Sequence, residues 1–207
     1  MLGLHMESAP VPLPREVYPP REDTELLLPF ARGNAGRWVL EIGCGSGVIA
    51  MEAAREGARV IATDRNPYAV AFVAACAEHG SLDLEVLRTD LASGVRPVDR
   101  ILSNPPYLPT PASARDPDPW HNLALDGGWD GCRVLARIVA GLWEHLRSPG
   151  EAFVVGSSRQ DPDRVREILQ EFRDRGGSVD IVARKALPDE VLVVHRFRVR
   201  ADRASPA

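Results

Sequence analysis

Lysine is almost absent from this sequence, because Lys185 is the only one among 25 basic residues. The acidic residues outnumber the basic ones, and the formal net charge is −4 at pH 7. A protein that coats nucleic acid in general needs a strongly basic surface. The charge balance therefore argues against nucleic acid as a partner.

Cysteine is also scarce. Cys44, Cys76 and Cys132 are odd in number and far apart, so no CxxC pair exists. Neither a zinc knuckle nor a disulfide framework fits this spacing, and we expect no metal site. Unpaired cysteines are typical of a reducing compartment, so we expect a cytoplasmic protein.

Long apolar runs are missing as well. No segment approaches the roughly 20 apolar residues that a membrane-spanning helix needs, and the first residues lack a basic stretch followed by an apolar one. We therefore expect a soluble protein with no membrane partner. The length of 207 residues suits one domain with a sizeable core.

Strand and helix patterns alternate along most of the chain. We expect a proline-rich irregular segment over 1–20, one domain over 21–200 and a tail over 201–207. The hydrophobic pattern predicts strands over 38–42, 59–63, 84–88, 100–103, 152–156, 179–183 and 191–199. It predicts helices over 22–31, 48–56, 67–79, 132–146 and 163–175, and a long loop over 105–128.

This alternation indicates an α/β protein whose parallel sheet is covered by helices on both faces. The last two strands are separated only by residues 187–190, which is too short for a crossover helix. These strands should pair antiparallel. The prediction is a doubly wound, seven-stranded, mostly parallel sheet with an antiparallel terminal hairpin.

A glycine-rich turn follows the first predicted strand, with Gly43, Cys44 and Gly45 at its centre. Ligands bind at the carboxyl ends of strands in such sheets, and glycines let the backbone approach them closely. Such a turn also occurs in proteins that bind dinucleotides. Ala50 can take the place of the third glycine of that motif, so spacing alone does not exclude NAD.

Three acidic positions favour S-adenosylmethionine over a dinucleotide. Glu41 precedes the first glycine, where a carboxylate suits a cationic amino acid moiety and repels a pyrophosphate. Asp64 ends the second strand, at the place expected for an acid that binds ribose hydroxyls. Asp90 can accept the adenine amino group, and Leu91 can pack on the ring. Each aspartate, taken alone, also fits a turn or a helix cap.

Asn104-Pro105-Pro106-Tyr107 follows the fourth strand. Two prolines end the strand, and Pro105 holds Asn104 in an extended conformation. This geometry can bind a planar NH2 group: the side-chain oxygen of Asn104 and a proline carbonyl accept its two hydrogens, and the ring of Tyr107 covers its face. A plain proline-rich loop is the alternative. Trp120 and His121, in the following loop, are either substrate contacts or merely exposed.

Together these motifs resemble the HemK-type release-factor glutamine methyltransferases. Residues 17–27 resemble the segment that precedes the core in the short eukaryotic and archaeal branch of that family, and residues 124–131 resemble its glycine-rich loop. The resemblance implies a class I methyltransferase fold and the cofactor S-adenosyl-L-methionine, with S-adenosyl-L-homocysteine as product. It implies a cofactor site made of Thr24, Glu41, Gly43, Cys44, Gly45, Asp64, Asp90, Leu91 and Asn104, and catalysis by Asn104, Pro105, Pro106 and Tyr107.

The implied activity is N5-methylation of the glutamine in the Gly-Gly-Gln loop of a class I peptide-chain release factor. Bacterial members carry a separate N-terminal helical domain that recognises the release factor. In this chain only about 20 residues precede the matching segment, so recognition is expected to come from the long loop, the N-terminal segment or a partner. The short branch commonly works with a small zinc-binding activator subunit, which is therefore an expected partner. Two alternatives stay open: an adenine-N6 methyltransferase acting on DNA or RNA, and a cofactor-binding subunit of a methyltransferase complex.

Overall fold

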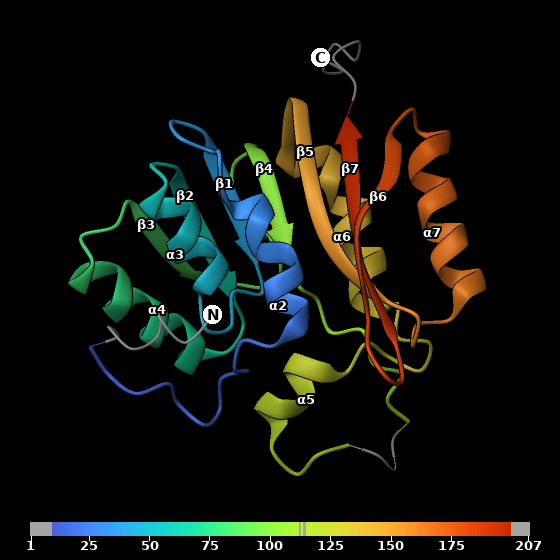
Figure 1. Cartoon of the computed structure of the whole chain (residues 1–207), viewed down its shortest axis with the longest axis horizontal. Helices are drawn as coiled ribbons and strands as arrows, with labels where there is room; N and C mark the ends of the chain where they lie inside the picture. Colours follow the sequence, from blue (N-terminus) through green and yellow to red (C-terminus); the bar gives the residue numbers. More distant parts are fainter. Residues whose placement is uncertain (1–9, 112, 114, 200–207) are drawn as a thin grey trace.

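The computed structural model describes residues 10–111, 113 and 115–199, and within them seven strands form one sheet (Figure 1). The strands are β1 (Trp38–Ile42), β2 (Arg59–Asp64), β3 (Leu84–Arg88), β4 (Val98–Ser103), β5 (Leu146–Ser157), β6 (Ser178–Ala186) and β7 (Val191–Val199). Their spatial order is β3-β2-β1-β4-β5-β7-β6. β7 is antiparallel to both neighbours and the other pairs are parallel, which confirms the predicted sheet.

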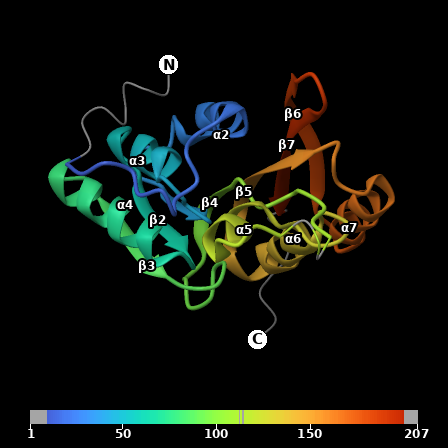
Figure 2. The ribbon, with the colours of Figure 1, turned by 90° about the horizontal axis from the view of Figure 1, so that it is seen from below.

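Helices cover both faces of this sheet. They are α2 (Glu22–Leu27), the 3-10 helix η1 (Leu28–Ala31), α3 (Val48–Arg55), α4 (Pro67–His79), α5 (Pro119–Leu125), α6 (Arg133–His145) and α7 (Pro162–Asp174). Figures 1 and 2 show α2 and α3 on one face and α6 on the other. α4 shares a core with α3, and α7 shares one with α6.

β1 is buried along nearly its whole length and is largely apolar because each face of the sheet has its own core. Successive side chains of a strand point to opposite faces. Val39 therefore packs in the cluster that contains Leu27 of α2 and Phe72 of α4, whereas its neighbour Leu40 packs in the cluster that contains Leu135 of α6. A strand buried on both faces reads as a continuous apolar run, which is the pattern seen in the sequence.

One helix was not predicted. Residues 105–128 were expected to form a loop, but they contain α5, which lies below the lower edge of the sheet in Figure 1. Asp118 caps this helix by accepting the backbone N–H of Trp120 at 2.8 Å, and Pro119 occupies its first turn. An aspartate followed by proline is a helix-start signal. The short length and the surrounding proline and aspartate residues concealed it.

The segment over 10–20 contains neither helix nor strand, but it is bound to the core. Val17 is buried, and the side-chain amide of Asn66 donates a hydrogen bond to the carbonyl oxygen of Glu16 at 2.7 Å. The remainder of the predicted irregular segment, and the predicted tail over 201–207, lie outside the described residues. The domain bounds stay a prediction.

Cys44, Cys76 and Cys132 are free and buried. Among the described residues, no three or more histidine, cysteine or acidic side chains are placed so as to hold a metal ion. No helix in the part of the chain that the structure describes is long and apolar enough to cross a membrane.

The buried His195 of β7 makes the stability of the fold depend on pH. Burial, and then the charges of Arg173 and Arg184, lower its pKa from 6.5 to about 4. Because an unfolded histidine binds a proton below its higher pKa, the stabilisation from neutral His195 is complete above pH 6.5 and is lost as the pH falls towards 4. We expect His195→Gln to lessen the fall in unfolding free energy between about pH 6.5 and 4.5 by about 2 kcal/mol.

Urea unfolding at several pH values measures this difference. The exposed His79, replaced by glutamine in the same way, is the matched control for the loss of a histidine side chain at the surface. An equal loss of stability in the His195→Gln variant and the unaltered protein would contradict the prediction.

Candidate functional site

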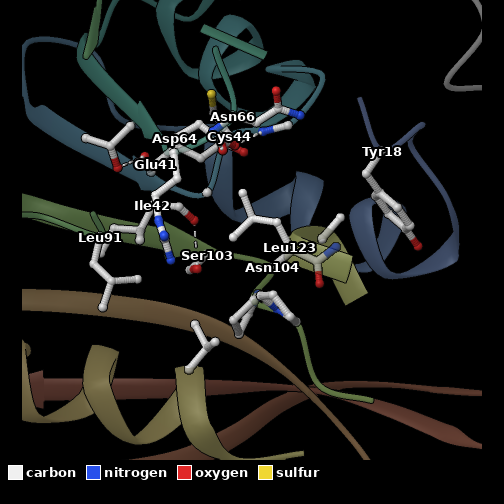
Figure 3. A pocket seen from close by; sticks show the side chains of 18 of the residues that line it. Tyr18, Glu41, Ile42, Cys44, Asp64, Asn66, Leu91, Ser103, Asn104 and Leu123 are labelled. Atoms are coloured by element: carbon white, nitrogen blue, oxygen red, sulfur yellow. Dashed lines mark hydrogen bonds between the residues drawn. The ribbon is translucent and has the colours of Figure 1, made fainter. Parts of the chain in front are cut away.

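The predicted residues meet in one cavity at the carboxyl ends of β1, β2 and β4 (Figure 3). In that view Tyr18, Asp64, Leu91 and Asn104 surround the same space. Every residue predicted for cofactor binding and catalysis lines it: Thr24, Glu41, Gly43, Cys44, Gly45, Asp64, Asp90, Leu91, Asn104, Pro105, Pro106 and Tyr107. The strand order therefore brings together motifs that are as much as 83 positions apart in the sequence, Thr24 and Tyr107 being the outermost.

The glycines of the β1–α3 turn have different tasks. Gly43 and Gly47 both have a left-handed backbone, with φ of +73° and +71°. A Cβ atom on Gly43 would meet no atom within 4 Å, whereas one on Gly47 would lie 2.6 Å from Val73. Gly43 therefore exposes its backbone to the cavity, and Gly47 allows α4 to pack closely against the turn.

Asp64 joins the glycine-rich turn to the end of β2. Its Oδ2 accepts the N–H of Gly45 at 2.9 Å, and its Oδ1 accepts the N–H of Asn66 at 2.8 Å. Burial raises the pKa of Asp64, and these backbone donors partly offset that effect. A carboxylate has about four lone-pair sites, so both oxygens can still accept ribose hydroxyls.

Glu41 supports the first turn of α3. Its Oε2 accepts the N–H of Ala50 at 2.8 Å, one of the donors that a helix leaves unpaired at its N-terminus. Burial raises the pKa of this carboxyl group well above its usual range. A cation in the cavity would lower the pKa of Glu41 again. The observed contact of Glu41 is with the helix, and its contact with a cationic amino acid moiety stays a prediction.

The turn after β3 carries a strained residue. Leu91 has a φ of +53°, which leucine rarely adopts and which costs on the order of 1–3 kcal/mol. Its neighbour Asp90 binds Arg137 of α6 through two hydrogen bonds, at 2.8 and 3.3 Å. Arg137 lowers the pKa of Asp90. Arg137 also lines the cavity, and the sequence analysis did not predict it.

Asn104 lines the cavity and carries an unused hydrogen-bond acceptor. Its Oδ1 atom is buried and has no hydrogen-bond partner among the described residues. Buried polar atoms nearly always have a partner, so an unpaired one in a cavity wall indicates an acceptor for a ligand. The preceding residue, Ser103, donates its hydroxyl to the carbonyl oxygen of Ile42 at 2.8 Å, which ties the end of β4 to β1.

Tyr107 makes a contact that was not predicted. Its hydroxyl group donates to Oδ2 of Asp23 at 3.1 Å, and Tyr18 donates to the same oxygen at 3.2 Å. Burial, followed by the nearby Asp23, raises the pKa of both phenols, so both are neutral donors at pH 7. Asp23 is next to the predicted Thr24, but only the folded structure shows what it binds.

The glycine-rich loop predicted over 124–131 begins in α5, and its part over 126–131 packs against the backbone that follows Asn104, which we call the corner Asn104–Tyr107. Gly127 donates its N–H to the carbonyl oxygen of Leu108 at 2.9 Å. A Cβ atom on Gly131, which has a φ of +73°, would lie 2.4 Å from the carbonyl oxygen of Tyr107. The loop therefore supports the backbone of the corner from behind.

The helix α5 closes another side of the cavity. Trp120 lines it and packs edge-to-face against Tyr68, with 6.0 Å between ring centroids. His121 does not line the cavity; its Nε2 lies 3.4 Å from the carbonyl oxygen of Arg15. Trp120 therefore faces the cavity, and His121 contacts the segment over 10–20. A contact of either residue with substrate stays a prediction.

Comparison with known proteins places this arrangement in a family. Residues 22–116 match the methyltransferase small domain. A protein of Methanocaldococcus jannaschii, named as a protein N5-glutamine methyltransferase, is 34% identical over 95% of this chain and 99% of its own length. The mouse methyltransferase HEMK2 is 31% identical over 88% of this chain and 90% of its own. The release factor glutamine methyltransferase of Deinococcus radiodurans is 35% identical, and the match covers 60% of that protein.

Solved structures share the fold. The Mtq2–Trm112 complex of E. cuniculi, described as responsible for methylation of the termination factor eRF1, superposes with a TM-score of 0.65 at 24% identity, over 88% of this chain and 98% of the other. A ribosomal protein L11 methylase of Lactobacillus delbrueckii gives a TM-score of 0.63 at 19% identity, over 86% of this chain and 80% of the other.

The strand order with its reversed β7 is that of a class I methyltransferase. The motifs lining the cavity and the extent of the sequence matches narrow the class further. The chain belongs to the HemK family of release-factor glutamine methyltransferases, which are S-adenosylmethionine-dependent enzymes.

Proposed function

We propose that this protein transfers a methyl group from S-adenosyl-L-methionine to the side-chain nitrogen of the glutamine in the Gly-Gly-Gln loop of a class I release factor. The observation that supports it most directly is the unpaired, buried Oδ1 of Asn104 in the cavity wall. A primary amide is a ligand that brings an N–H donor to that atom. The name of the M. jannaschii relative, which matches nearly the whole chain, supports methylation of a protein glutamine, and the mouse relative is named as a methyltransferase.

The cavity contains suitable groups for each part of the cofactor. The open backbone at Gly43 and the acid Glu41 would face its methionine end, together with Thr24. Asp64 would accept the ribose hydroxyls, while Asp90 and Leu91 would take the adenine. When bound, S-adenosylmethionine supplies an electrophilic methyl group on a sulfonium sulfur.

The protein's part in the reaction is to orient a weak nucleophile. The lone pair of an amide nitrogen is delocalised into its carbonyl group. Asn104 Oδ1 and the carbonyl oxygen of Pro105 would accept its two hydrogens, which directs the nitrogen and raises its electron density. Pro106 stiffens the corner, and Tyr107 would cover the amide plane. Preorganised acceptors and positioning of this kind contribute roughly 7–11 kcal/mol in favourable cases.

We also propose a small zinc-binding activator as a partner and the cytoplasm as the site of action. The Mtq2 structure is that of a complex with Trm112, and its fold is the one seen here. Tyr18 of the segment over 10–20 and Trp120 of the region over 105–128 line the cavity, so these two parts of the chain, together with the partner, would recognise the release factor.

Radiolabelled S-adenosylmethionine and purified release factor test this function, with and without a candidate activator. We expect label on the Gly-Gly-Gln glutamine and none on a release factor in which that glutamine is alanine. An oligonucleotide arm distinguishes the adenine alternative, for which transfer and binding would weaken steeply with salt. No transfer to release factor under any of these conditions would contradict the proposal.

A further inference from the structure

We propose that Asp23 is a positioning residue, which fixes the ring of Tyr107 over the acceptor site through its hydroxyl group. This role goes beyond the corner Asn104–Tyr107 itself, because Asp23 lies in α2, on a different element of the fold. It deepens the proposed function and rests on it for the substrate of the assay.

The carboxyl group of Asp23 is buried and accepts several hydrogen bonds. The residue is only 3% exposed. Its Oδ2 accepts the hydroxyls of Tyr107 and Tyr18, at 3.1 and 3.2 Å. Its Oδ1 accepts the backbone N–H of Thr24 at 2.7 Å, which holds the carboxyl plane relative to α2. The oxygen that faces Tyr107 therefore has a direction set by the helix.

Tyr107 is thereby held at both ends. Its backbone is backed by Gly131, where even a Cβ atom would clash with the carbonyl oxygen of Tyr107. Its ring packs against the core cluster that contains Leu27 and Leu102, and a contact at the hydroxyl end adds a directional restraint to that packing. The bond to Asp23 supplies this contact. A ring that must cover an amide plane benefits directly, because small misplacements near the reacting atoms are costly.

The same oxygen links the corner to the segment over 10–20. Tyr18 belongs to that segment, which Asn66 also holds through the carbonyl oxygen of Glu16. Two tyrosines from different parts of the chain therefore share one acceptor in the cavity wall. Asp23 therefore connects Tyr18, in the segment over 10–20, to Tyr107, in the corner that would face the substrate.

A double-mutant cycle between Asp23→Ala and Tyr107→Phe tests the inference, since coupled residues give non-additive effects. We expect each single change to lower kcat for release-factor methylation by about tenfold or more. In the Tyr107→Phe background, Asp23→Ala should lower kcat by less than about twofold, because the hydroxyl that it orients is already gone. The dissociation constant of S-adenosylhomocysteine should change less than about threefold.

Asp180→Ala is the matched control. Asp180 also binds two side chains, those of Arg196 and Arg198, but it lies on β6 outside the cavity lining. Its kcat should stay within about twofold of the unaltered enzyme. If Asp23→Ala does not fold, the same cycle with Asp23→Asn, which keeps the side-chain volume, replaces it.

The outcomes separate this inference from the proposed function. Equal losses from the Asp23 change in both backgrounds would overturn the positioning role, as would a loss confined to S-adenosylhomocysteine affinity. An equal kcat loss in Asp180→Ala would show general destabilisation and overturn it as well. If the unaltered enzyme methylates no release factor, the proposed function fails first, before the cycle is measured.

Discussion

Replacing Asn104 by alanine is expected to lower kcat for methyl transfer by about 10²–10³-fold, while the protein still binds S-adenosylhomocysteine. The variant removes the side-chain acceptor that we propose for the substrate amide, and deleting a preorganised group of this kind costs about 3–4 kcal/mol. The buried Oδ1 has no hydrogen-bond partner within the described part of the chain, so little folding energy depends on it. Steady-state methylation assays measure the loss in kcat, and calorimetric titration with S-adenosylhomocysteine measures the retained binding.

Asn34→Ala provides a matched control. Asn34 is fully buried, and its Oδ1, like that of Asn104, has no hydrogen-bond partner among the described residues. Its amide nitrogen donates to the carbonyl oxygens of Phe30, Ala31 and Arg32, and the residue does not line the cavity. Its loss should lower stability and leave kcat per folded molecule within about twofold. Full activity of Asn104→Ala with normal cofactor binding would instead identify the chain as a cofactor-binding subunit.

Gly131→Ala is expected to destabilise the protein strongly. Its left-handed backbone alone costs a Cβ-bearing residue about 1–2 kcal/mol. The added carbon would also lie 2.4 Å from the carbonyl oxygen of Tyr107, and overpacking of this kind typically costs about 1–3 kcal/mol more. We expect a loss of about 2–5 kcal/mol in unfolding free energy, with activity falling because the corner itself must shift.

Gly36→Ala isolates the backbone contribution to that loss. Gly36 has the same φ of +73°, but a Cβ atom there would meet nothing within 4 Å. Urea unfolding should therefore show only the left-handed penalty of about 1–2 kcal/mol and unchanged activity. Equal destabilisation in the two variants would mean that the contact with Tyr107 relaxes without cost.

Most of the fold was predictable because its local signals agree with one another. β1 and β3 have the bounds that their apolar runs indicate, and α4 begins at the proline and ends at the histidine that mark its limits. β5 runs over Leu146–Ser157, whereas the sequence predicts a strand only over 152–156. The prediction starts too late because the first half of the strand contains charged residues, proline and glycine, which are not typical of strands. Pairing with neighbouring strands extends β5 against local preference.

The site was predictable where a residue's task is local to its motif. Gly43 and Asn104 could be inferred from the strand ends that carry them. Asp23 and Arg137 could not, because each acts on a partner far away in the sequence: Asp23 on Tyr107, and Arg137 on Asp90. Glu41 was expected to serve a ligand, and its observed contact is with the helix that follows the turn.

The alkylation rates of the three buried thiols report how often the surrounding regions of the enzyme open. Burial raises the pKa of Cys44, Cys76 and Cys132, the last to about 11, so each side chain is both shielded and protonated at neutral pH. Since thiolates are the reactive species, alkylation requires each region to open first. Cys44 sits in the cavity wall, Cys76 in α4 and Cys132 beside the glycine-rich loop, so their separate labelling rates would follow three parts of the molecule at once.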